Sequence, residues 1–197
     1  TEIIKLSYAK GFIKADKELV NVDFDLLNTH YYREWKVSRG LANDSIEKSL
    51  FKTGLARKNE QGKIEPTRAA VLLFAEYPTN IMETKCTIRI YKYAGTIETF
   101  KETPNLIGKP ETIEGPIIKL ISKAQKYVLQ QLESGIEIRS GFLTKYKIPE
   151  RVIKEAITNA VIHRDYNIKR DIEIKMFEDR IEIRSPGLFP YNITKSN

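Results

Sequence analysis

The sequence predicts an α+β fold, and three features of its pattern lead to this prediction. Residues 116–134 and 149–163 repeat apolar side chains at helical spacing, as helices with one buried face do. Residues 85–93 and 171–184 alternate apolar and polar side chains, as strands with one buried face do. Hydrophobic residues make up 41% of the 197 residues and charged residues 30%, which is typical of globular proteins with packed cores.

The net charge indicates which partners suit the chain, and the lack of long apolar runs argues against a membrane protein. The formal net charge is +7, which suits an anionic partner such as a nucleic acid or a nucleotide. No apolar run approaches the length of about 18 residues that a membrane-spanning helix needs, and no signal peptide is evident. We therefore expect a cytoplasmic protein without a membrane partner. The single cysteine, Cys86, excludes a disulfide within one chain, and we expect it to be buried.

Residues 102–116 are rich in Pro, Gly, Asn and Thr and are predicted to separate two units, 1–110 and 111–197. In the first unit we expect an apolar, buried helix at 66–75 and a hairpin over 85–101. The second unit is expected to place helices on one side of a sheet, in the order helix, strand, helix, hairpin.

Within the first unit, residues 24–65 have the outline of a winged helix, which is two helices followed by a hairpin. We expect the helices at about 24–38 and 45–53 and the hairpin at about 55–65. Aromatic residues on the first helix could stack on bases, but their spacing favours a place in the core: Tyr31, Tyr32 and Trp35.

Local signals mark the ends of both helices. Asp23 is a predicted cap of the first helix, and Asp44 forms a pair with Glu47 that resembles a capping box at the start of the second. Gly40 and Gly54 are predicted to end the two helices.

The winged-helix-like segment carries an excess of basic residues. Residues 33–68 hold nine basic and five acidic side chains. Lysine and arginine on the second helix and the hairpin can bind DNA phosphates. The residues predicted to do so are Lys48, Lys52, Arg57, Lys58 and Lys63. A solvated face of a small packing unit is the open alternative.

Residues 149–187 are the most informative part of the chain. Pro149 suits the first turn of a helix, on which Glu155 and Asn159 are four residues apart and share one face. A glutamate can orient or deprotonate a water molecule, and an asparagine carbonyl oxygen is a ligand suited to Mg²⁺. The same spacing occurs on many solvated helices, so the pair alone leaves a site and a solvated face both open. The apolar side of this helix is expected to contain Val152, Ile153, Ala156, Ile157, Ala160, Val161 and His163.

Two strands and a turn are predicted after this helix. Residues 171–177 and 180–184 alternate in polarity around Glu178 and Asp179, which predicts a hairpin. Ser185-Pro186-Gly187 then predicts a tight turn. A further strand at 136–143 is expected to join the same sheet.

Three segments, in this order, resemble the C-terminal region of one protein family: Glu155–Tyr166, Phe177–Ile183 and Ser185–Gly187. The family is that of the RecG-like transcriptional regulators, which are also described as related to ATP-dependent DNA helicases and as divergent AAA-type proteins. Residues 66–78 resemble the family as well, so the resemblance covers most of the chain. It implies that the second unit is a partial α/β sandwich similar to the GHKL ATPase fold of gyrase, Hsp90 and histidine kinases.

This resemblance implies ATP and Mg²⁺ as cofactors. Asn159 falls where the GHKL fold coordinates the Mg²⁺ bound to the triphosphate, and Glu155 falls where gyrase- and Hsp90-like members keep the base that activates water. Ser185 and Gly187 fall at the adenine-contacting motif. The residues that close the helix are also expected to contribute to cofactor binding: His163, Arg164 and Asp165. For the arginine, a phosphate contact and an interaction with backbone carbonyls at the helix end are equally open.

The chain departs from the GHKL pattern in ways that bear on activity. Ser185 stands where the fold has Asp, and a hydroxyl accepts the adenine amino proton without the strengthening charge of a carboxylate. The chain begins at Thr1 and ends at Asn197, before any Gly-rich lid, so we expect a fragment of a longer protein. No Walker-type motif occurs, so a P-loop helicase motor is not supported. His163-Arg164-Asp165 also opens a protein-kinase catalytic loop, but Arg170 stands where that loop needs Asn.

Taken with the resemblance, these residues predict a RecG-related transcriptional regulator that couples Mg-ATP binding to DNA binding. A weak GHKL-type ATPase activity is left open. The alternative is a DNA-binding or scaffolding module with a degenerate, non-hydrolysing nucleotide site, and a structural oligomerisation domain is a third interpretation. DNA is the expected partner, and a homodimer is left open.

Overall fold

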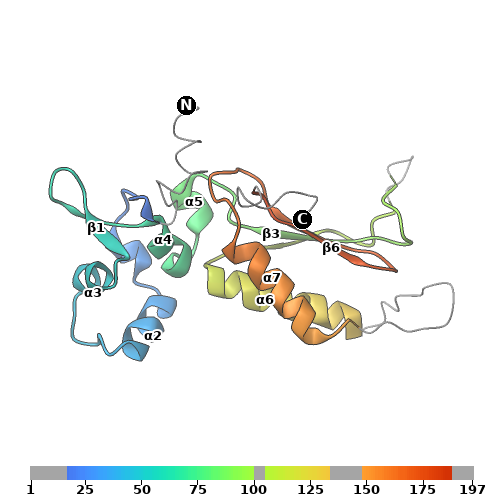
Figure 1. The fold of residues 1–197 in the computed structure, drawn as a ribbon, viewed down its shortest axis with the longest axis horizontal. Coiled ribbons are helices and arrows are strands. Elements are labelled where there is room, and N and C mark those ends of the chain that lie inside the picture. Colours follow the sequence, from blue (N-terminus) through green and yellow to red (C-terminus); the bar gives the residue numbers. More distant parts are fainter. Residues whose placement is uncertain (1–16, 100–104, 134–147, 188–197) are drawn as a thin grey trace, which may run out of the picture.

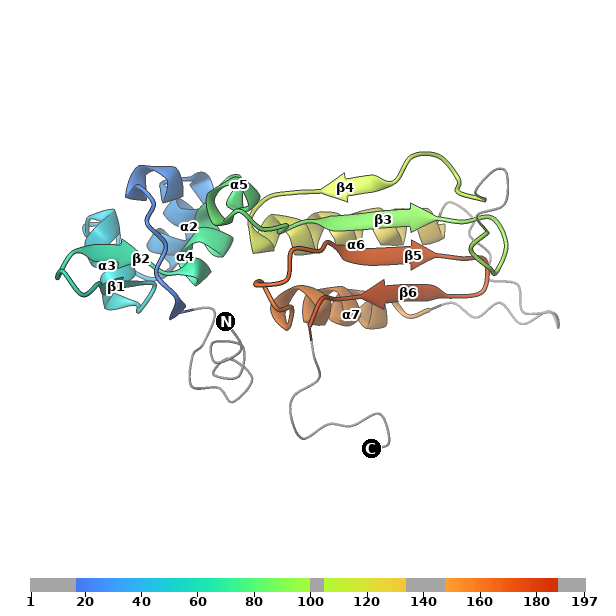
Figure 2. The same cartoon turned by 90° about the horizontal axis from the view of Figure 1, so that it is seen from above.

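The computed structural model describes residues 17–99, 105–133 and 148–187. The strand expected at 136–143 and most of residues 1–20 lie outside these ranges. The described residues form helices and two sheets, so the fold is α+β, as predicted (Figure 1). A unit with a small sheet lies beside a unit with a larger sheet (Figure 2).

The first unit is built from short helices around a two-stranded sheet. Its elements are η2 (Phe24–Leu27, a 3₁₀ helix), α2 (His30–Ser38), α3 (Ile46–Lys52), β1 (Ala56–Lys58), β2 (Ile64–Pro66), α4 (Arg68–Phe74) and α5 (Pro78–Met82). The helical regions and the hairpin expected in residues 24–65 are present, and β1 and β2 pair antiparallel. The hairpin turn contains Gly62 at a φ of 79°, a conformation that glycine adopts without steric cost.

The helix expected at 24–38 is divided into two. Asp23 caps the first part, η2, because its carboxylate accepts a hydrogen bond from the N–H of Asp25 at 3.0 Å. Helix α2 begins only after Thr29. The hydroxyl of Thr29 does not cap α2 but donates to the carbonyl oxygen of Phe74 at 2.6 Å, which ties the start of α2 to α4.

The start of α3 also differs from the prediction. Ser45, not Asp44, caps α3, and its hydroxyl accepts a hydrogen bond from the N–H of Lys48 at 3.3 Å. Either residue type is a good cap, and the carboxylate of Asp44 is instead used in ion pairs with lysines. Pro78 begins α5, in keeping with the preference of proline for a first helical turn.

Helix α4 is the centre of the first core. Its residues Val71 and Phe74 are fully buried, together with Leu50 of α3. The rings of Tyr32 and Trp35 lie 5.6 and 5.0 Å from the ring of Phe74, between centroids. The aromatic residues of α2 therefore belong to the core, as their spacing favoured.

The second unit contains a four-stranded sheet in the order β4-β3-β5-β6. The strands are β3 (Ile88–Lys92), β4 (Glu111–Ile113), β5 (Ile172–Met176) and β6 (Ile181–Arg184). Strands β5 and β6 form the predicted antiparallel hairpin, in which Ile174 lies opposite Ile183. Strand β3 runs parallel to β5, with Ile90 opposite Ile174.

The described part of the segment 85–101, residues 85–99, does not form the expected hairpin. Residues 96–99 contain no strand, and β3 pairs instead with β4 and β5. As a result β3, which we expected in the unit at 1–110, packs in the second core, and β4 lies within the presumed linker at 102–116. Alternation locates a strand but not its partner, and a parallel partner is always distant in the sequence.

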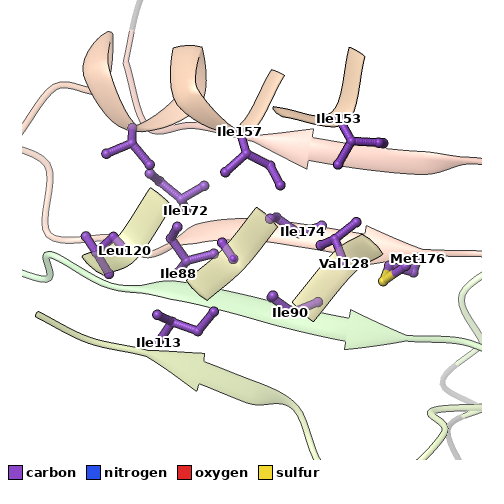
Figure 3. Packing of buried hydrophobic residues seen from close by; sticks show 12 residues of the cluster. Ile88, Ile90, Ile113, Leu120, Val128, Ile153, Ile157, Ile172, Ile174 and Met176 are labelled. Carbon is purple, nitrogen blue, oxygen red and sulfur yellow. The ribbon is translucent and has the colours of Figure 1, made fainter. Parts of the chain in front are cut away.

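Helices α6 (Ile117–Glu133) and α7 (Glu150–Ile162) cover one face of this sheet, as predicted (Figure 2). Their buried side chains and those of the strands form one core (Figure 3). It includes Leu120 and Val128 from α6, Ile153 and Ile157 from α7, and Ile88, Ile90, Ile113, Ile172, Ile174 and Met176 from the strands. Each fully buried side chain of this kind contributes about 1.5–3 kcal/mol, so the core fixes the orientation of α7.

Cys86 precedes β3 and is buried, as predicted. Burial raises the pKa of its thiol to about 11, so the thiol stays protonated at neutral pH. Among the helices of the described ranges, none is long and apolar enough to cross a membrane.

Candidate functional site

Helix α7 presents the predicted catalytic pair to solvent because its opposite side is anchored in the core. The helix begins at Glu150, directly after Pro149, which occupies the N-cap position. Ile153, Ile157 and Val161 recur every four residues and are buried against the sheet. This spacing leaves the residues on the other side of the helix exposed.

The apolar side of α7 is narrower than predicted. Val152 is 51% exposed, and His163, at the C-cap, is exposed as well. Ala156 and Ala160 are half-buried. Each residue is rotated by about 100° from its chain neighbour, so the position before Ile153 turns away from the sheet.

Glu155 and Asn159 are both exposed and line the same open hollow, whose volume is about 500 Å³. The other lining residues are Glu150, Arg151, Lys154 and Thr158, none of which was predicted. Arg151 and Thr158 lie four and three residues from Glu155, so helical spacing could have identified these two.

Hydrogen bonds order one side of this hollow. Lys154 pairs with Glu150, with 2.5 Å between Nζ and Oε1. Gln125 of α6 donates from Nε2 to the carbonyl oxygen of Lys154 at 3.0 Å and to Oγ1 of Thr158 at 3.1 Å. By contrast, within the described ranges no side-chain hydrogen bond or ion pair occupies the carboxylate of Glu155, which leaves it available to a ligand.

The exposed oxygens suit a metal ion that arrives bound to a ligand. In the part of the chain that the structure describes, no group of three or more His, Cys, Asp and Glu side chains could hold a metal ion by itself. Mg²⁺ commonly binds one or two protein oxygens, while phosphate oxygens and water complete its shell. Asn159 and Glu155 offer an amide oxygen and a carboxylate one helical turn apart, so this donor set fits a Mg²⁺ carried by a phosphate ligand.

The predicted adenine-contacting turn lies against the end of α7. The hydroxyl of Ser185 donates to the carbonyl oxygen of Ala160 at 2.7 Å. The N–H of Asp165 donates to the carbonyl oxygen of Pro186 at 2.8 Å. Ala160 directly follows Asn159, so the turn reaches the helix next to the residue that borders the hollow.

The structure therefore gathers the predicted cofactor residues into two neighbouring groups. Glu155 and Asn159 lie at the hollow, and the 185–187 turn lies at the helix end with His163 and Asp165. The last residue of the turn, Gly187, lies beside Asp165: a Cβ added there would be in ordinary van der Waals contact, 3.6 Å from the backbone nitrogen of Asp165.

Arg164 belongs to neither of these two groups. Its side chain is 5% exposed, and its Nη2 donates to the carbonyl oxygens of Ile168 and Arg170 at 3.0 and 2.5 Å. The guanidinium lies over the ring of Tyr166, 4.9 Å from the centroid, and burial lowers its pKa. These carbonyls lie beyond the end of α7, so Arg164 holds the loop after the helix.

The basic residues of α3 are partly neutralised. Lys48 and Lys52 both pair with Asp44, at 3.0 and 2.7 Å. Hydrogen bonds from Lys52 and Lys48 hold the pKa of this carboxyl below its usual value, so the pairs persist at neutral pH.

The basic residues of the hairpin are less engaged in ion pairs than those of α3. Lys63 lies 3.8 Å from Glu65, which is a loose pair. Arg57 and Lys58 are exposed on β1, and neither has an ion-pair partner within residues 17–99, 105–133 and 148–187. A phosphate backbone would therefore meet its most available cations on β1.

No family model matches the chain, and no curated protein matches it. The solved structures that are similar include the crystal structure of the DIP2311 protein from Corynebacterium diphtheriae, a structural genomics target, at a TM-score of 0.56 and 19% sequence identity. The similarity covers 98% of this chain and 36% of that protein, so the chain spans about a third of its length. At this identity the likeness shows the fold alone, and it extends through both units.

Proposed function

We propose that the second unit binds Mg-ATP on the exposed face of α7 and that this binding regulates DNA binding by the basic first unit. One observation carries the nucleotide half of the proposal. Glu155 and Asn159 are exposed at one hollow, and the 185–187 turn meets α7 at the residue that follows Asn159. A nucleotide lying along the last turns of α7 would contact both groups.

Each residue has a distinct role in this proposal. The amide oxygen of Asn159 holds the metal, and the carboxylate of Glu155 orients the attacking water and accepts its proton. The hydroxyl of Ser185 donates to Ala160, which leaves its lone pairs to accept the adenine amino group. Mg²⁺ bound to the phosphates would neutralise charge that develops on their oxygens.

The charges around the hollow support a phosphate ligand. Arg151 and Lys154 are both exposed on its lining. The ion pair of Lys154 with Glu150 joins two exposed side chains, and such pairs are worth about 0–1 kcal/mol, so a triphosphate can replace the carboxylate as partner.

Hydrolysis provides the test of the role of Glu155. Glu155→Gln keeps the shape of the side chain and removes its ability to take a proton. We expect Mg-ATP affinity to stay within about threefold of the wild type and turnover to fall by about 10²–10⁴-fold, the usual contribution of a general base. Glu114→Gln, which changes an exposed glutamate outside the hollow, is the control. Unchanged turnover in Glu155→Gln would remove Glu155 from the mechanism.

A second candidate is a DNA-binding module whose nucleotide site no longer turns over. It is favoured by Ser185, an uncharged residue that stands where the GHKL fold has Asp. This candidate predicts DNA binding that falls steeply with salt and no turnover of Mg-ATP. Turnover that is lost in Glu155→Gln would exclude it.

A further inference from the structure

The loop that follows α7, residues 163–171, contacts the first unit as well as the 185–187 turn. Arg68, the first residue of α4, donates from Nη1 to Oδ1 of Asn167 at 2.6 Å. The same guanidinium pairs with Glu18. Because α4 is the centre of the first core, the bond between Arg68 and Asn167 joins that core to the loop after the proposed site.

Two further contacts fix the junction between the units. Leu72 of α4, Cys86 and Tyr166 of the loop form a small buried cluster. Lys119 of α6 pairs with Glu76, which follows α4, at 2.9 Å. The apolar cluster and the Arg68–Asn167 hydrogen bond join α4 to the loop, and the Lys119–Glu76 pair joins the end of α4 to α6.

Inside the loop, Asp165 connects the 185–187 turn to Asn167. Its N–H donates to the carbonyl oxygen of Pro186 at 2.8 Å, and its Oδ1 accepts a hydrogen bond from the N–H of Asn167 at 2.9 Å. Tyr166 between them is buried, and its hydroxyl donates to the carbonyl oxygen of Val161 at 2.9 Å. A displacement of the turn is therefore passed on to Asn167 instead of being absorbed within the loop.

The single tryptophan of the chain lies at the other end of α4. The Trp35 ring is 5.0 Å from the ring of Phe74, the last residue of α4, and the hydroxyl of Thr29 bonds to the carbonyl oxygen of Phe74 at 2.6 Å. A movement of α4 would change the packing around Trp35, so its fluorescence reports on the first core.

We propose that the hydrogen bond between Arg68 and Asn167 transmits the state of the α7 site to the first unit. This inference rests on the proposed function. It names the contacts through which nucleotide binding would regulate DNA binding. A nucleotide that contacts Ser185 and Gly187 shifts the 185–187 turn. The shifted turn displaces Asp165 and, through it, Asn167. The hydrogen bond from Arg68 to Asn167 then moves α4. Coupling between two sites can be carried by a contiguous chain of packed side chains and hydrogen bonds, and the residues above form such a chain.

The test titrates the purified full-length protein with Mg-ATP and follows binding by two signals, the heat in a calorimeter and the fluorescence of Trp35. In the wild type we expect both signals to saturate with the same Kd. Arg68→Ala and Asn167→Ala should retain the heat and lose most of the fluorescence change. The double variant should lose no more than either single variant, since both remove one contact. Asn167 is exposed, so Asn167→Ala remains informative if Arg68→Ala unfolds.

Lys85→Ala is the matched control. It removes the ion pair of Lys85 with Asp171, 3.3 Å long, which lies at the end of the same loop but does not involve α4. Its fluorescence response should equal that of the wild type.

Three outcomes would overturn the inference, and only the last of them would also overturn the proposed nucleotide site. Heat without any fluorescence change in the wild type would leave the nucleotide site in place and refute the coupling. A full response in Asn167→Ala would refute the route through Arg68. The absence of heat would refute the nucleotide site and, with it, this inference.

Discussion

The buried lysine of the second unit, Lys175, is paired with a carboxylate. Lys175 of β5 is 8% exposed, and its Nζ lies 2.6 Å from Oε2 of Glu98. The hydroxyl of Tyr93 donates to the other carboxylate oxygen at 2.7 Å. These bonds, from Lys175 first and Tyr93 second, hold the pKa of Glu98 below its usual value of 4.5, because they favour the ionised form.

This pair predicts a dependence of stability on pH. A carboxyl whose pKa is lowered by folding contributes stability above its unfolded pKa, near 4.5, and loses it as the pH falls through the folded value. Glu98→Gln leaves the buried Lys175 without its charged partner and should cost about 1–3 kcal/mol at pH 7. Urea unfolding at pH 7 and at about pH 3 measures both effects.

The variant should also lose less stability than the wild type on acidification, since the titrating group is gone. Glu114→Gln, at an exposed position, serves as the control and should follow the wild type. Equal pH dependence in Glu98→Gln and the wild type would contradict the assignment of this pair.

At the same scale, the candidate site shows which residue roles the sequence can predict. Glu155 and Asn159 were placed on one exposed face because helical spacing is a local property that survives folding. The burial of Arg164 was not predicted, because it depends on Tyr166 and on carbonyls after the helix. Nothing in the sequence distinguishes an arginine that faces solvent from one that turns inward.

At the scale of elements, α3 and the β1–β2 hairpin differ in how available their cations are. Lys48 and Lys52 share Asp44, whereas Arg57 and Lys58 of β1 have no ion-pair partner within the described ranges. A cation that is already paired gains less from a phosphate, because the carboxylate must first be displaced.

This difference predicts opposite effects on DNA binding. Arg57→Ala and Lys58→Ala should each weaken binding and reduce the slope of log K against log salt by about 1. Lys48→Ala should have a smaller effect. Asp44→Asn should strengthen binding, because it frees two lysines. Fluorescence anisotropy with labelled duplex DNA over a range of salt concentrations measures all four, and weaker binding in Asp44→Asn would contradict this assignment.

The elements also differ in how far sequence could predict them. Helices α6 and α7 and the β5–β6 hairpin were predicted because long periodic patterns and short turns are local signals. Strand β4, with three residues, is too short to show a pattern, and the parallel pairing of β3 with β5 joins distant segments. Because of this non-local pairing, β3 belongs to the core of the second unit and not to the first unit, where we expected it.

At the scale of the whole molecule, α4 is shared between the two units. It forms the centre of the first core and contacts the loop after α7 through Arg68 and Leu72. The basic hairpin and the candidate nucleotide site are therefore connected through one short helix, which is the structural basis for the regulation that we propose.

The most direct test of this account is a calorimetric titration of the full-length protein with Mg-ATP, as the wild type and as Asn159→Ala. Asn159 is exposed, so its replacement should leave the thermal stability within about 0.5 kcal/mol of the wild type. The account predicts saturable heat in the wild type and a loss of affinity of at least about tenfold in the variant, because a ligand of the metal is removed. No heat in the wild type, or equal affinity in the two proteins, would contradict the proposal that α7 forms a nucleotide site.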